Sequence, residues 1–312
     1  MTNAFNKGVS VNLKSATVVT LISLAYLILS RIVVGYKSDQ LVLVGLCNVL
    51  FYLSSITRKF VIAFLIIIVY WVIFDYMKAF PNYLTAPVHI ADLYHFEKHV
   101  FGIWSGGHLL TPNEYFKIHG TTFLDIMGGF FYLCWIPVPL MFGAFLFFTR
   151  PKQFLYFALT FFLVNLLGFV VYYSFPAAAP WYVQLHGFKF IAHTPGNVGG
   201  LAKFDQYFHT QIFKSIYEKS SNVFAAMPSL HSSYPVIVLY YGVKNKLGLF
   251  NVILATVMVG IWFTAVYTSQ HYICDVLAGI TCATIGINLF NFILKRSAGF
   301  QGFIDRYYQI IA

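Results

Sequence analysis

The sequence predicts an all-α polytopic membrane protein, a bundle of about eight transmembrane helices. Apolar residues make up 59% and charged residues only 10% of the 312 positions, and the mean hydropathy is +0.73. Soluble domains carry about 25% charged residues, so this composition belongs to a membrane protein. The first apolar run, from Ala16 to Val34, is too long for a signal-peptide core, and we expect it to be retained as a span.

Each expected helix follows from the length of an apolar run, since crossing a bilayer takes roughly 20 apolar residues. Two of the runs are short, and two long polar interruptions lie at 78–121 and 176–228. The aromatic content of 80–118 favours short helices lying on the membrane surface. The expected spans are 15–35, 41–57, 60–77, 122–149, 152–175, 229–243, 249–268 and 271–294.

Charge placement orients the bundle. Basic residues precede the first span and then occupy every second turn: Lys7, Lys14, Arg58, Lys59, Arg150, Lys152, Lys244, Lys246, Lys295 and Arg296. Short loops with such residues stay in the cytoplasm, so we expect both termini inside and both long loops on the non-cytoplasmic face. The same scattering explains the net charge of +10 and argues against a nucleic-acid partner.

Two segments at this outer end have the residues for chemistry. They are MPSLHSS, from Met227 to Ser233, and SQHYICDVLAG, from Ser269 to Gly279, each at the expected start of an inward-running span. A helix N-terminus offers free N–H groups and a partial positive charge, which suits a phosphate.

The spacing of three residues predicts a phosphoryl-transfer site. His271 and Asp275 are four apart and share a helix face, so the carboxylate can accept a proton from one ring nitrogen and leave the other nucleophilic. His231 precedes His271 by one inward and one outward span, which returns the chain to the same depth. One histidine would attack phosphorus while the other protonates the leaving alcohol.

Three other interpretations remain open at this point. The pair His271–Asp275 and His231 could be structural polar groups inside the bundle. The same three residues could hold zinc, although the HExxH or cysteine-rich spacing of zinc sites is missing, and the four cysteines show no ligand or disulfide pattern. A transporter would need ionisable residues through the membrane, whereas here they gather at one end. We therefore expect no metal and no cofactor.

The two segments resemble the second and third motifs of the type-2 phosphatidic acid phosphatase superfamily, and most closely the fungal inositol phosphorylceramide synthases. The matching stretches are FPAAAPWY (Phe175–Tyr182), GGLAKFD (Gly199–Asp205), VFAAMPSLHS (Val223–Ser232) and, more weakly, LDI (Leu124–Ile126). The resemblance implies a metal-independent enzyme with a six-helix core. The core would span 60–294, after two N-terminal spans in 1–59 and before a cytoplasmic tail in 295–312.

Carried over to this sequence, the resemblance makes His271 the nucleophile, Asp275 its orienting carboxylate and His231 the acid for the departing alcohol. Ser229 and Ser232, with the N–H groups at that helix start, would hold phosphate oxygens.

The sequence departs from the phosphatase motifs where these place three cations. The corresponding positions are Tyr172, Ala179 and Ala265, and the outer loop 176–228 contains no arginine. A phosphomonoester carries nearly two negative charges and usually meets arginines, whereas a phosphodiester carries one. The missing cations therefore favour a transferase that acts on diesters.

The other candidate substrate-binding residues come from the matching stretches. Lys203 is the best remaining cation, Asp205 shares its motif, and Asp125 could bind an inositol hydroxyl, brace a histidine or be structural. Trp181 and Tyr182 would sit at the membrane interface and guide lipid tails.

The expected reaction transfers a polyol phosphate, phosphoinositol in the first instance, from a phosphatidylinositol-like donor to the primary hydroxyl of a ceramide-like acceptor. A lipid phosphatase is the alternative enzyme. The sequence has no glycosylation sequon and no long polar tail, which favours a bacterial inner membrane over a Golgi membrane.

Overall fold

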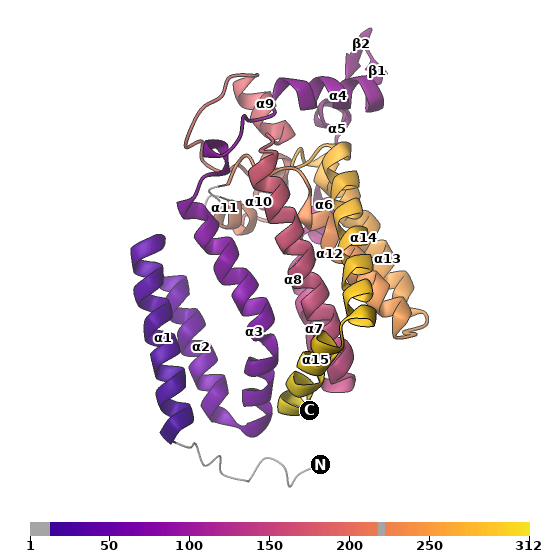
Figure 1. The fold of residues 1–312 in the computed structure, drawn as a ribbon. Helices are drawn as coiled ribbons and strands as arrows, with labels where there is room; N and C mark the ends of the chain where they lie inside the picture. The colour runs from indigo at the N-terminus through magenta and orange to yellow at the C-terminus, as the bar shows by residue number, and fades with distance from the viewer. Residues whose placement is uncertain (1–12, 218–221) are drawn as a thin grey trace.

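A computed structural model describes residues 13–217 and 222–312; Lys7 lies outside them. The all-α prediction is confirmed, with long helices in one bundle and short elements gathered at one end (Figure 1). The long helices are α1 (Leu13–Val33), α2 (Ser38–Leu53), α3 (Ser55–Tyr76), α6 (Thr122–Leu133), α7 (Pro137–Thr149), α8 (Pro151–Ser174), α12 (Leu230–Lys244), α13 (Phe250–Tyr267) and α14 (Ile273–Arg296).

The short elements come from the two long interruptions and cover the end of the bundle opposite the start of α1 and the C-terminus (Figure 1). Two short helices, α4 and α5, lie in the region 80–118, as the aromatic content suggested, and α5 ends one residue beyond it. The β1–β2 hairpin between these helices was not predicted. The elements are η1 (Met77–Ala79), η2 (Asn82–Leu84), α4 (Ala91–Phe101), β1 (Ile103–Ser105), β2 (His108–Leu110), α5 (Pro112–His119), α9 (Pro180–His186), η3 (Gly199–Leu201), α10 (Ala202–Tyr207) and α11 (Ile212–Tyr217).

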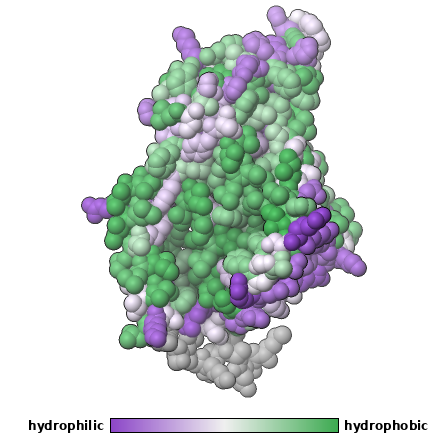
Figure 2. All heavy atoms as spheres, in the orientation of Figure 1, coloured by the Kyte–Doolittle hydropathy of each residue, from purple (hydrophilic) through white to green (hydrophobic). Residues whose placement is uncertain are grey.

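Within the described residues, six helical segments are long and apolar enough to cross a membrane. Figure 2 shows the matching surface, a wide hydrophobic band with hydrophilic side chains toward its two ends. The second and sixth spans are short, as expected, at 16 and 15 residues. The expected span 122–149 is interrupted between α6 and α7, because Pro137 at the start of α7 lacks the N–H that a continuous helix needs.

The core forms where α12 packs against α8, α13 and α14. Gly279 lets α14 approach the start of α12: a Cβ at this position would lie 2.1 Å from the carbonyl oxygen of Ser229. The Ser233 hydroxyl donates to the Gly279 carbonyl at 2.7 Å and fixes the same crossing. This close contact places the starts of the two helices side by side.

The two ends of the chain differ in how they join the core. Helix α1 contacts mainly α2 and is largely exposed. The segment 295–312, expected as a cytoplasmic tail, contains the helix α15 (Ala298–Ile311), which packs against α3, α8 and α14. Ile304 and Ile311 on α15 are buried in the main core, so this segment closes the end of the bundle that lies opposite the short elements.

Candidate active site

The close approach of α12 and α14 brings the two predicted catalytic histidines together. His231 lies in the first turn of α12, and His271 lies in the turn that precedes α14. Their rings face each other, with His231 Nδ1 3.1 Å from His271 Nε2. His271 is 5% exposed, so the pair is largely shielded from water.

His271 is held on three sides by backbone and amide groups. Its ring nitrogen Nδ1 lies 2.9 Å from the carbonyl oxygen of Ala226. Its backbone N–H donates to the carbonyl of Ala265 at 2.9 Å. Asn113 Nδ2, on α5, donates to the His271 carbonyl at 2.9 Å and to that of Val266 at 2.8 Å. A carbonyl can only accept, so Nδ1 carries the proton and the lone pair is on Nε2, toward His231.

Asp275 lies farther from His271 than the sequence analysis expected. Its Oδ2 is 3.7 Å from His271 Nδ1, beyond hydrogen-bond distance, and accepts the Tyr272 N–H at 2.8 Å. The backbone carbonyl of Ala226 therefore sets the tautomer, and Asp275 lies within ion-pair distance of the imidazole. The expectation of a direct hydrogen bond was wrong because the carboxylate is taken by the helix start that carries it.

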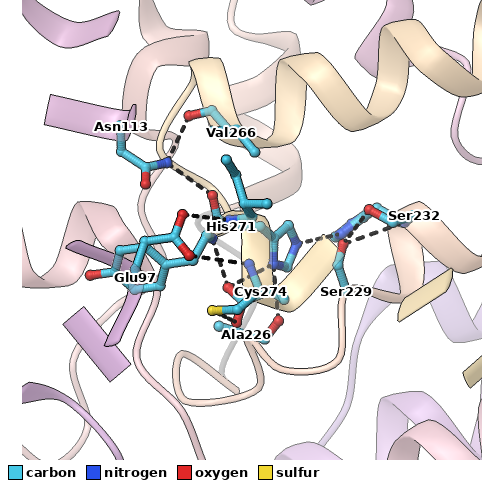
Figure 3. Close-up of polar contacts among 12 residues, drawn as sticks. Glu97, Asn113, Ala226, Ser229, Ser232, Val266, His271 and Cys274 are labelled. Atoms are coloured by element: carbon cyan, nitrogen blue, oxygen red, sulfur yellow. Dashed lines mark hydrogen bonds and ion pairs between the residues drawn. The ribbon is translucent and has the colours of Figure 1, made fainter. Parts of the chain in front are cut away.

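A second carboxylate caps α14 from a distant part of the chain. The N–H groups of Ile273 and Cys274 donate to Glu97 Oε1 at 2.8 Å and Oε2 at 3.2 Å (Figure 3). Glu97 lies on α4 and is fully buried, and burial raises its pKa. The start of α14 was expected to offer free N–H groups to a phosphate, and Glu97 takes two of them. Neither Glu97 nor Asn113 was predicted, because no local pattern links them to a histidine far along the chain.

Ser229 and Ser232 form a cap within α12. Ser229 Oγ accepts the Ser232 N–H at 3.3 Å and the Ser232 hydroxyl at 3.0 Å, and both side chains are fully buried. Both serines lie beside His231, as predicted, and their hydroxyls are bonded to each other. Their expected contact with phosphate oxygens remains untested.

Aromatic rings enclose His231 on the side of α6. The Trp135 ring, at the break between α6 and α7, lies 4.4 Å from the His231 ring, and the Tyr132 ring lies 5.4 Å away. The three positions where the phosphatases place cations, Tyr172, Ala179 and Ala265, are all buried. The two rings that lie against His231 on this side are aromatic and uncharged.

Lys203 and Asp125 are brought together, near the outer start of α6. Lys203 Nζ lies 3.4 Å from Asp125 Oδ1, which also accepts the Tyr267 hydroxyl at 2.6 Å. The Lys203 side chain is 45% exposed and open to solvent. Asp125 braces Tyr267 in this arrangement, and the structure gives it no contact with a histidine.

Three further residues that were predicted to bind substrate are buried inside the protein. Asp205 is buried and accepts the N–H groups of Phe213 at 3.2 Å and Lys214 at 2.9 Å, which ties α10 to α11. Trp181 and Tyr182 are buried beneath the outer elements, so the expectation that they lie at the lipid interface was wrong. Hydrophobic rings whose polar atoms find partners pack inside as readily as at an interface: the Tyr182 hydroxyl donates to the carbonyl of Lys189 at 2.7 Å.

The zinc interpretation requires at least three converging ligands. Across residues 13–217 and 222–312, no group of three or more histidine, cysteine, aspartate or glutamate side chains is arranged to hold a metal ion. His271 Nδ1 is turned to a carbonyl and Asp275 to a backbone N–H, which leaves the two histidines facing each other alone.

Comparison with known proteins finds relatives that are named as synthases of inositol-containing sphingolipids. The chain is 45% identical over 304 residues to the phosphoinositol dihydroceramide synthase of Bacteroides thetaiotaomicron, covering 96% of this chain and 98% of that protein. It is 29% identical to the inositol phosphorylceramide synthase of Candida albicans over 51% of this chain and 35% of that one. It is 25% identical to the inositol phosphorylceramide synthase catalytic subunit of Schizosaccharomyces pombe over 74% of this chain and 53% of that one.

No solved structure shows a significant match to the chain. The sequence profile described as the PAP2 superfamily matches residues 92–289, which include α4 with Glu97, α5 with Asn113 and both histidine motifs. The relatives, the profile and the paired histidines agree, and the chain belongs to the PAP2 superfamily.

Proposed function

We propose that this protein is a membrane phosphotransferase that moves phosphoinositol from a phosphatidylinositol-like donor to a ceramide-like acceptor through a phosphodiester on His271. The observation that carries the proposal is the pair of facing ring nitrogens, His271 Nε2 and His231 Nδ1, 3.1 Å apart, with His271 Nδ1 facing a carbonyl. The names of the relatives, which include a phosphoinositol dihydroceramide synthase, support the choice of donor and acceptor.

The first step makes one P–N bond and breaks one P–O bond. His271 Nε2 attacks the phosphorus of the donor, and the bond to the glycerol oxygen of diacylglycerol breaks. His231, protonated in the complex with the anionic donor, gives its Nδ1 proton to that oxygen. The two rings must separate to admit the phosphate, since reacting atoms approach to about 3–3.5 Å before reaction.

The second step reverses the roles. The primary hydroxyl of the ceramide-like acceptor attacks the phosphorus, and neutral His231 takes its proton as a general base. The P–N bond breaks, which frees His271 and leaves His231 protonated for the next cycle. Asp275, 3.7 Å from His271, would stabilise the positive charge on the phosphorylated ring.

The membrane supplies the reason for a lipid acceptor. Both histidines lie at the outer end of the bundle, where a lipid hydroxyl is concentrated and oriented, and holding two reactants in place is worth about 7–11 kcal/mol. The positions of the basic residues support an active site on the non-cytoplasmic face. The Bacteroides relative supports a bacterial inner membrane.

The test supplies the purified protein with phosphatidylinositol labelled with ³²P, with and without ceramide. We expect inositol phosphorylceramide when ceramide is present, identified by mass spectrometry, and an acid-labile label on the protein when it is absent. His271→Ala should abolish both, His231→Ala should abolish transfer, and His99→Ala, an exposed histidine on α4, should change neither.

Two outcomes would contradict the proposal. One is a rate for His271→Ala above about a hundredth of the wild-type rate, since a lost nucleophile leaves no covalent route. The other is rapid release of inorganic phosphate from phosphatidic acid that is indifferent to ceramide, which would make the protein a lipid phosphatase.

A further inference from the structure

The wall beside His231 contains a buried phenol with no bonding partner. Tyr132 on α6 is fully buried, and its ring lies 5.4 Å from the His231 ring. Among the described residues, no group makes a hydrogen bond of normal geometry with the Tyr132 hydroxyl. Buried polar groups without a partner are rare and costly, so each one calls for an explanation.

A second phenol of the same kind lies next to the first. Tyr217 is the last residue of α11 and packs in the same hydrophobic cluster as Tyr132. The two hydroxyls lie near each other, but they do not form a hydrogen bond of normal geometry. The Tyr217 hydroxyl is also buried, and it has no hydrogen-bond partner in the described part of the chain. Burial raises the pKa of Tyr217, so this phenol keeps its proton and stays a donor at neutral pH.

A third phenol stands where the phosphatases place the lysine of their first motif. Tyr172, near the end of α8, is buried and packs in the same hydrophobic cluster as Leu230 at the start of α12. The three phenols come from α6, α8 and α11. Tyr132 lies against His231, Tyr217 packs in the cluster of Tyr132, and Tyr172 packs in the cluster of Leu230, the residue before His231.

The charge of the substrate explains why phenols would stand there. A phosphodiester carries a single negative charge, and the rings that contact His231 are those of His271, Tyr132 and Trp135. Neutral hydroxyl donors can satisfy a singly charged group, whereas a phosphomonoester with nearly two charges would remain under-compensated.

We infer that the hydroxyls of Tyr132, Tyr172 and Tyr217 bind the non-bridging phosphate oxygens of the diester donor. They take the place of the cations that hold phosphomonoesters in the phosphatases. The two unpartnered hydroxyls find their hydrogen bonds only in the substrate complex. This inference rests on the proposed function and adds the groups that select a diester.

The test removes one hydroxyl at a time, with Tyr132→Phe and Tyr217→Phe. We expect kcat/KM for phosphatidylinositol to fall roughly tenfold to a hundredfold in each, the usual effect of losing a hydrogen bond to a charged group. The melting temperature should stay the same or rise, because the free protein loses a polar group that has no partner. A purely structural tyrosine would not show this combination.

Tyr241→Phe is the matched control. Tyr241 is fully buried on α12, and its hydroxyl lies 2.8 Å from that of Thr160, within hydrogen-bond distance. This variant should lower the melting temperature and leave kcat/KM unchanged. Activity of Tyr132→Phe and Tyr217→Phe within twofold of wild type, or a fall that follows a lower melting temperature, would overturn the inference.

A competition experiment separates the phosphate from the polyol ring as the bound group. Glycerophosphoinositol, which has the phosphodiester, should inhibit both variants less than wild type, while inhibition by free inositol should not change. Equally weakened inhibition by inositol would overturn the assignment to the phosphate. If wild type transfers no headgroup at all, the proposed function fails, a result distinct from active wild type with unaffected variants.

Discussion

The starts of α12 and α14 are side by side, and each carries one of the two histidines proposed to be catalytic, yet they are built in different ways. Helix α12 is capped by its own sequence, with Ser229 accepting the N–H of Ser232 three residues later. Helix α14 is capped twice, by Asp275 from its own first turn and by Glu97, 176 residues before Ile273. The cap of α12 comes from neighbouring residues, whereas the cap of α14 also requires α4 to be in place.

The difference indicates how the nucleophile is made rigid. His271 lies in a turn outside any helix, so its backbone is held by the carbonyl of Ala265 and by Asn113 from α5. Helices α4 and α5 thus act as a brace beneath which the turn is fixed (Figures 1 and 3). His231 lies inside a helix and needs no such support. Disturbing the brace should therefore affect His271 first.

Among the substitutions that test this comparison, Glu97→Ala should have the largest effect on stability and activity. It leaves the N–H groups of Ile273 and Cys274 buried and unpaired, which costs about 1–3 kcal/mol for each donor. We expect a clearly lower melting temperature and severe loss of transfer. Asp92→Asn, an exposed position on the same helix, is the control and should change neither. Normal activity and stability in Glu97→Ala would show that the remote cap is dispensable.

Asp275→Asn tests the cap that α14 supplies itself. The carbonyl of Ala226 still sets the tautomer of His271, so the variant loses only the charge near the ring, about 1.5–3 kcal/mol for a charged partner. We expect kcat to fall roughly tenfold to a hundredfold, with the label on His271 still detectable. Complete loss of labelling would mean that Asp275 takes the Nδ1 proton directly during the reaction.

Ser229→Ala tests the local cap of α12 and should have a smaller effect. Loss of a serine cap costs about 1 kcal/mol of stability. His231 lies on the helix that this cap starts, and the core packing of α12 remains. We expect a slightly lower melting temperature and a rate within about tenfold of wild type. A loss as large as that of His231→Ala would indicate that the hydroxyl contacts the substrate.

The pH dependence of stability should give the smallest signal. Burial raises the pKa of Glu97 above its ordinary value of 4.5, so the folded state binds more protons than the unfolded state between the two values. The stabilisation that comes from this extra proton on Glu97 is thus fully present below pH 4.5. It is lost as pH rises through the raised pKa of the folded state. Chemical denaturation in Glu97→Gln should lack this part of the slope. An unchanged slope would place the effect in another group.

Much of the fold could be predicted because a bilayer imposes a simple length rule. The spans, their order and the shared side of both termini follow from apolar runs and basic residues. The interruption at Pro137, the β1–β2 hairpin and the helix α15 were not predicted. Short elements of this kind are decided by packing more than by hydropathy.

The candidate site also contains residues that could be predicted from the sequence and residues whose positions could not. Sequence spacing and motifs alone led to His231, His271 and Asp275, since residues four apart share a helix face and a helical hairpin returns to its starting depth. Trp181, Tyr182 and Asp205 were chosen from the matching stretches by their residue type, and the structure buries them. Residue type tells what a side chain can do, and only packing tells which atoms it faces.

The sequence by itself determined a membrane bundle with two histidines at one end, and its missing cations led to the prediction of a substrate with a single charge. Only the tertiary structure decided that a carbonyl orients His271, that Glu97 and Asn113 brace it from α4 and α5, and that Tyr132 lies beside His231. The reason is physical: hydropathy and helical period act along neighbouring residues, whereas these contacts join side chains far apart in the chain. Such contacts exist only after the helices have packed.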